Sequence, residues 1–202
     1  MMYYILFLYT LYVSYCIYRK GGKARGYLAF GIFSIAAAEY TEIAGMVNPH
    51  IYPLLFKFSL IGFVLAIFLF YRSAQILFTY EKRYLPVIVL LLFVGITLFI
   101  PVVKTVEVVN GYTVEHFSIY GLLAVIYFVY YLTLFIFENR RLAKTITSKE
   151  IRRKHKRYVF IIVALVISVV ICHAVSVILK LPPLDIISAT VFIALLKSMF
   201  KR

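Results

Sequence analysis

The chain has 202 residues, 64% of them hydrophobic, and its mean hydropathy is +0.96. This composition leaves no stretch polar enough for a second, soluble domain, so we expect one membrane domain over residues 1–202. The net charge of +14 would suit nucleic-acid binding. However, every lysine and arginine except Lys57, Lys104 and Lys180 lies in alternate gaps between apolar stretches or at the C-terminal end. We therefore expect no nucleic-acid partner.

Seven apolar stretches account for most of the chain. Each approaches the length of about 20 residues that a helix needs to cross a hydrocarbon core about 30 Å thick. We therefore expect an all-α membrane protein, a seven-transmembrane-helix bundle that passes repeatedly through the cell membrane. The expected spans are residues 3–18, 27–47, 51–71, 84–103, 118–137, 158–179 and 184–200.

The basic residues predict the orientation of this bundle. They fill the first, third and fifth gaps and the C-terminal end, and cytoplasmic loops carry an excess of lysine and arginine. The N-terminus should therefore lie outside and the C-terminus inside. The fifth gap should contact anionic lipids or dock a cytoplasmic signalling partner or membrane subunit through Arg140, Arg141, Lys144, Arg152, Arg153, Lys154, Lys156 and Arg157.

Two gaps contain local structural signals. In the fourth gap, β-branched runs flank Asn110-Gly111, which predicts a small extracellular β-hairpin between the fourth and fifth helices. In the fifth gap, Thr147 and Glu150 have the spacing of a capping box, so the sixth helix should begin as a cytoplasmic extension.

Four ionisable residues inside the spans are the candidate ligand-binding residues: Glu39, Glu42, Lys57 and His173. A charge in a span is costly unless it is paired or faces water, and all four are expected in one layer of the outer half. Glu42 and Lys57 lie at matching depth on adjacent antiparallel spans, which predicts an ion pair. That pair would either lock the two spans together or leave one negative charge lining a pocket.

Specific cofactor chemistry is not indicated. Glu39, Glu42 and His173 could form a histidine–carboxylate metal site, but their spacing is not diagnostic. The sequence lacks a second histidine within the spans for haem, a lysine midway down the last span for retinal, and any hydrolase or phosphate-loop motif. We expect no cofactor, we identify no catalytic residue, and an enzyme is not favoured.

A further pattern runs through both halves of the chain. It comprises Ala38-Glu39, residues 56–62, the tyrosines between 120 and 131, the basic run 152–157, and residues 181–187 and 195–200. This pattern resembles the seven-helix N-terminal sensor region of certain bacterial and archaeal histidine kinases. The chain departs from those kinases because it stops just beyond the seventh span, without a phosphoacceptor helix or an ATP-binding domain. The resemblance, with this departure, implies a free-standing sensor, an accessory subunit or a sensor domain used for another purpose.

Three functions follow from these observations. We expect a receptor-like membrane sensor with an outward-facing polar pocket for a small molecule, a lipid or an ion. The alternatives are a proton-coupled small-solute transporter and an accessory or structural subunit of a membrane enzyme complex. The transporter is less favoured because the inner halves of the spans carry no comparable ionisable layer.

Overall fold

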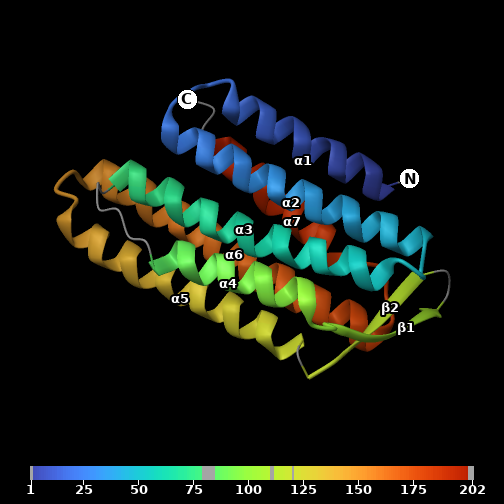
Figure 1. Cartoon of the computed structure of the whole chain (residues 1–202). Helices are drawn as coiled ribbons and strands as arrows, with labels where there is room; N and C mark the ends of the chain where they lie inside the picture. The colour runs from blue at the N-terminus through green and yellow to red at the C-terminus, as the bar shows by residue number, and fades with distance from the viewer. Residues whose placement is uncertain (1, 79–84, 110–111, 120, 200–202) are drawn as a thin grey trace.

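The computed structural model describes residues 2–78, 85–109, 112–119 and 121–199. These residues form seven helices and one two-stranded sheet (Figure 1). The elements in chain order are α1 (Met2–Tyr18), α2 (Lys23–Val47), α3 (Tyr52–Phe78), α4 (Leu85–Phe99), β1 (Val103–Val109), β2 (Tyr112–Phe117), α5 (Gly121–Thr145), α6 (Lys149–Leu179) and α7 (Leu184–Met199).

Helix length and composition indicate a membrane protein. Three helical segments of the described chain are long and apolar enough to cross a bilayer: Lys23–Val47, Tyr52–Ile76 and Lys149–Leu179. Two shorter apolar helices, Met2–Tyr18 and Pro86–Phe99, accompany them. Many large apolar side chains on the outside of the bundle are exposed, among them Phe160 at 70% and Ile178 at 75%, as expected for surfaces in contact with lipid.

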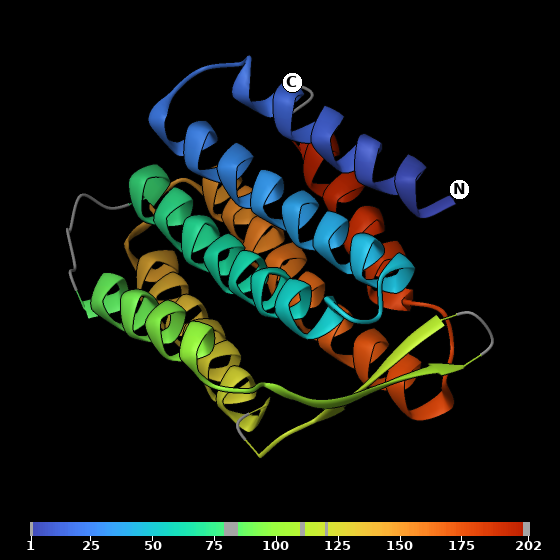
Figure 2. The same ribbon diagram turned by 45° about the vertical axis from the view of Figure 1, so that its right-hand side comes forward.

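The helices pack in layers (Figures 1 and 2). Helices α1, α2 and α7 lie along one side, α3 and α6 run through the middle, and α4 and α5 lie on the opposite side. Helices α2 and α3 make the most extensive contact of any helix pair described, and small residues lie at their interface. A methyl group on Gly62 would lie 2.9 Å from the backbone oxygen of Ser34, so only glycine permits this approach of the two backbones.

The predicted hairpin is confirmed, and strands β1 and β2 pair antiparallel with Val109 opposite Tyr112. The expected turn residues, Asn110 and Gly111, lie outside the described residues. The hairpin lies across one end of the bundle, beside the α2–α3 and α6–α7 turns (Figure 2). We call this the hairpin end. The opposite end, with the α1–α2 and α5–α6 connections, is called the basic end.

Several helix boundaries differ from expectation: α3 continues to Phe78, beyond the predicted residue 71, and α5 covers Gly121–Thr145 instead of residues 118–137. Helix α4 ends at Phe99, earlier than the predicted residue 103, because β1 already begins at Val103. Helix α6 does begin well before the apolar stretch, at Lys149, but its N-cap is Ser148, whose side chain accepts a hydrogen bond from the Ile151 amide. Thr147 is therefore not the cap, and Glu150 pairs with Lys154 at 2.6 Å instead of closing a capping box.

Candidate functional site

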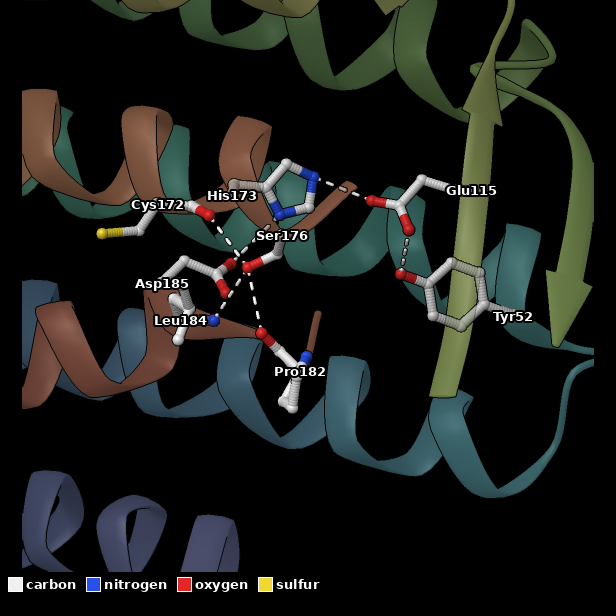
Figure 3. A network of polar contacts seen from close by, with 8 residues as sticks. All are labelled: Tyr52, Glu115, Cys172, His173, Ser176, Pro182, Leu184 and Asp185. Carbon is white, nitrogen blue, oxygen red and sulfur yellow. Dashed lines mark hydrogen bonds and ion pairs between the residues drawn. The ribbon is translucent and has the colours of Figure 1, made fainter. Parts of the chain in front are cut away.

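His173 on α6 lies at the centre of a polar cluster at the hairpin end (Figure 3). Its Nδ1 atom is 3.2 Å from Oδ2 of Asp185, and its Nε2 atom is 2.8 Å from Oε1 of Glu115. Both carboxylates are almost completely buried, at 1% and 2% exposed. Two ring nitrogens facing two carboxylates is the arrangement that suits an imidazolium, which has two N–H donors and no free lone pair.

Glu115 reaches this cluster from the hairpin. Strand β2 carries it over the bundle, and Oε2 accepts a hydrogen bond of 2.9 Å from the hydroxyl of Tyr52 at the start of α3. Gly45 of α2 makes room for the ring, because a methyl group there would lie 2.5 Å from Tyr52 Cδ2. The hairpin, α3 and α6 therefore meet at one carboxylate.

Asp185 is positioned by the turn between α6 and α7. Lys180 ends α6 in the left-handed conformation, with φ of 52°. The Ser176 hydroxyl lies 2.9 Å from the Cys172 oxygen and 3.0 Å from the Pro182 oxygen, and it accepts a hydrogen bond from the Leu184 amide (Figure 3). This serine fixes the start of α7, so that Asp185 lies in its first turn, where a carboxylate is favoured by the helix dipole.

Glu42 of α2 completes the set, which we call the histidine cluster: Glu42, Glu115, His173 and Asp185. One potential ligand atom each from Glu42, His173 and Asp185 lies within 4.8 Å of the other two. Such a group could hold a metal ion only if His173 turned a lone pair toward it. In the structure, both of its ring nitrogens already face carboxylates.

Glu39, one helical turn deeper on α2, is separate from this cluster. It is fully buried, and neither carboxylate oxygen has a hydrogen-bond partner among the described residues. The Thr10 side chain of α1 lies beside it, but its hydroxyl donates to the Leu6 oxygen at 3.1 Å. Among the described residues, no contact joins Glu39 to His173 that would support a ligand role for Glu39.

The predicted ion pair between Glu42 and Lys57 is wrong. Lys57 Nζ donates to the backbone oxygen of Leu98 at 3.0 Å, and no ion pair joins it to Glu42 in the part of the chain that the structure describes. The two residues lie at similar depths, but Lys57 is on the face of α3 that packs against α4. There it satisfies one of the carbonyl groups that a helix end leaves without a partner.

Two hollows meet at the cluster. A small one of about 20 Å³, room for about one water molecule, lies under the hairpin beside Tyr52 and Glu115. A larger one of about 400 Å³ lies between α3, α5 and α6, and its wall is apolar except at the end formed by Glu42, His173 and Asp185 and at Ser59 and Ser118. Glu42 and His173 line both hollows.

A second polar group, at the basic end, was not predicted. His155 was expected in the fifth gap, outside the spans, and it is buried on α6, where its Nε2 atom lies 2.8 Å from Oδ1 of Asn139. Asn139 also donates to the Phe135 oxygen at 2.6 Å. The contact between His155 and Asn139 links α5 to α6 at the basic end.

A third polar group, which is exposed, fixes the hairpin to the end of the bundle. Oε2 of Glu107 lies 3.3 Å from Lys180 Nζ and 3.5 Å from His116 Nε2. Hydrogen bonds from these two partners, Lys180 first, lower the pKa of Glu107 below its ordinary value. The contact between Glu107 and Lys180 links β1 to the α6–α7 turn.

Comparisons with family models, with curated proteins and with solved structures find no match for this chain. The resemblance to the sensor region of histidine kinases therefore stays a prediction from the sequence.

Proposed function

We propose that the chain is a receptor-like membrane module that binds a small ligand at the histidine cluster. In this proposal all seven helices span the cell membrane, with the N-terminus and the hairpin outside and the C-terminus and the basic end inside. The positive-inside rule supports the orientation. The sequence resemblance to histidine-kinase sensor regions supports the role.

The observation that carries the proposal is the contact between Glu115 and His173. A strand in the proposed outer hairpin places its carboxylate 2.8 Å from a ring nitrogen on a buried helix face. A ligand that binds the cluster must compete with or reinforce this contact, so its arrival changes how firmly the hairpin is held against α6. Differential contact of this kind is what shifts a receptor between two states.

Helix α6 offers a route for that change. It is one continuous helix of 31 residues, about 46 Å long, and it joins the cluster to the basic end. Its first turns hold a row of exposed basic residues, opposite more on the last turns of α5, which would meet anionic lipid headgroups or a cytoplasmic signalling partner. A small displacement of α6 would therefore also move the basic residues of that surface.

The middle of the bundle favours a binder over a transporter. Between the histidine cluster and the His155–Asn139 pair, one small hollow is lined by apolar side chains, among them Ile35, Phe63 and Leu165, and Glu39 and Ser34 of α2 are buried elsewhere in this layer. A transported polar solute or proton needs a wetted path, and the apolar walls of this hollow do not provide one.

A ligand screen by thermal unfolding tests the proposal. The purified protein in lipid nanodiscs would be heated with small amines, divalent metals and lipids, alongside a proteoliposome flux assay. We expect at least one ligand to raise the unfolding midpoint in the wild type but not in Glu42→Gln or His173→Gln. Glu138→Gln, which alters a buried carboxylate at the basic end, is the matched control and should keep the effect.

Two outcomes would overturn the proposal. Solute flux that depends on Glu42 would establish a transporter. Stabilisation that is equal in Glu42→Gln and in Glu138→Gln would show that the cluster is not the binding site.

A further inference from the structure

We infer that the ligand of the histidine cluster is a membrane-soluble amphiphile with a cationic amine headgroup, which enters sideways from the lipid between α5 and α6. This inference rests on the proposed function and names the class of ligand. Two separate observations carry it: the position and wall of the larger cavity, and the charge of its polar end.

The cavity has the size and shape for an apolar chain. Its volume of about 400 Å³ falls within the range of small-molecule sites, and its walls are formed by Phe56 and Phe63 of α3 and by Phe128 and Leu132 of α5. The residues at its rim include Val129 and Ile171, which are 57% and 56% exposed. The mouth is therefore apolar and opens on the flank of the bundle, which faces lipid in the proposed topology.

The polar end of the cavity is rich in carboxyl groups. The cluster holds three carboxyl groups, those of Glu42, Glu115 and Asp185, around one imidazole, which can balance at most one of them when they are ionised. Oδ1 of Asp185 is buried and has no hydrogen-bond partner among the described residues.

Nearby lysines do not neutralise the carboxylates of the histidine cluster. Lys57 donates to Leu98, and Lys180 pairs with Glu107 outside the cluster. Uncompensated charge in a low-dielectric site costs several kcal/mol, so the complementary ligand group is a cation that donates hydrogen bonds.

An amine fits this end better than a metal ion. A metal ion that uses His173 as a ligand would need a lone pair from it, and both ring nitrogens already lie within 3.2 Å of carboxylate oxygens. An ammonium group needs only carboxylate acceptors, which Glu42 and Asp185 provide. A bare ion would also leave the adjoining apolar cavity without an occupant.

The test compares four probes with the full chain in nanodiscs at neutral pH. They are n-decylamine, n-decanol with a similar chain but no charge, n-butylamine with the headgroup but a short chain, and manganese chloride. At a hundredfold excess over its Kd, n-decylamine should raise the unfolding midpoint by about 5–10 °C. The other three should give much smaller shifts.

Two variants separate the headgroup site from the chain site. Glu42→Gln removes a headgroup contact, and Ala174→Phe fills the cavity from its exposed rim; each should abolish the shift with n-decylamine. Ala37→Phe, which makes the same change on an exposed face of α2, should leave it intact. If Glu42→Gln does not fold, Ala174→Phe against Ala37→Phe still decides the matter.

Equal shifts with n-decanol would overturn the inference, because the charge would not be recognised. Equal or larger shifts with n-butylamine or manganese that vanish in Glu42→Gln would also overturn it. They would nevertheless leave the cluster as a cation site and the proposed function intact. If no probe gives a shift that depends on Glu42, the amphiphile is excluded, and the wider ligand screen decides the proposed function separately.

Discussion

His173 shows how one residue can join three separate elements. The imidazole comes from α6, Asp185 from α7 and Glu115 from β2, and the two carboxylates lie on opposite sides of the ring. Removing one partner of a buried charged group costs more than the pair contributes, because the other charge is left without compensation. The cluster is therefore sensitive to single substitutions that leave side-chain volume unchanged.

Tyr52→Phe tests the contact that holds Glu115. The change removes the hydroxyl that donates to Oε2 of Glu115 at 2.9 Å and leaves that buried oxygen short of a donor. We expect the free energy of unfolding to fall by about 1–3 kcal/mol. The measurement is denaturant unfolding of the purified protein. Tyr15→Phe, at a residue 57% exposed, is the control and should change little; equal effects of the two variants would show that the hydrogen bond is not formed.

The sequence placed two members of the cluster correctly and missed two. Glu42 and His173 were singled out because ionisable residues inside apolar spans are rare, and the structure brings them together. Asp185 was considered only as one of residues 181–187 in the resemblance, and Glu115 only as a residue of the fourth gap, which holds the predicted hairpin. The sequence indicates how deep a residue lies along a helix, but not toward which neighbour it points, which is also why Lys57 was assigned the wrong partner.

At the level of elements, the α2–α3 interface depends on the absence of a side chain at Gly62. Gly62→Ala would place a methyl group 2.9 Å from the Ser34 backbone oxygen and 3.1 Å from Cβ of Ala38. Because a backbone atom cannot move aside as a side chain can, we expect a loss of about 1–3 kcal/mol in the free energy of unfolding. Thermal unfolding in detergent measures it.

Gly95→Ala on α4 is the matched control. Apart from its chain neighbours and the backbone of its own helix, no atom of the described residues lies within 4 Å of the methyl group that it would add, and alanine favours a helix over glycine by about 1 kcal/mol. This variant should be as stable as the wild type or more so. If Gly62→Ala behaved in the same way, the two helices would be farther apart than described.

The hairpin should loosen in acid. The pKa of Glu107 is lowered by Lys180 and His116, so its contribution to docking is complete above the ordinary carboxyl pKa of about 4.3. This contribution is lost as the pH falls through the lower value in the folded state. We expect a nitroxide at Val108→Cys, in a background without Cys16 and Cys172, to become more mobile by electron paramagnetic resonance below about pH 4.

Glu107→Gln provides the control for this titration. Its hairpin should be mobile at every pH, with no transition between pH 3 and 6. A transition that persists in this variant would assign the acid response to another group.

The elements were easier to predict than their contacts. Apolar length identified the helices, and the β-branched runs around Asn110-Gly111 identified the hairpin, because both signals are local. The C-terminal ends of α3 and α5 were misjudged, since polar residues continue both helices beyond the apolar stretch, whereas the early start of α6 was predicted. His155 lies in that predicted extension of α6, but its burial was not predicted.

At the level of the whole molecule, the two ends of the bundle differ in chemistry. The hairpin end holds the histidine cluster, whereas the basic end holds the exposed residues Arg140, Arg141 and Lys144 of α5, with Arg152 and Arg153 among those of α6. The proposed function depends on these ends lying on opposite sides of a membrane. That separation would place the ligand site outside and the basic surface inside.

Cysteine labelling of intact cells tests this claim most directly. Thr105→Cys on β1 and Thr147→Cys before α6 would each be made without Cys16 and Cys172; both threonines are exposed. We predict that a membrane-impermeant maleimide labels position 105 in intact cells and labels position 147 only after permeabilisation. Labelling of position 147 but not 105 in intact cells, or equal labelling of both, would contradict the account.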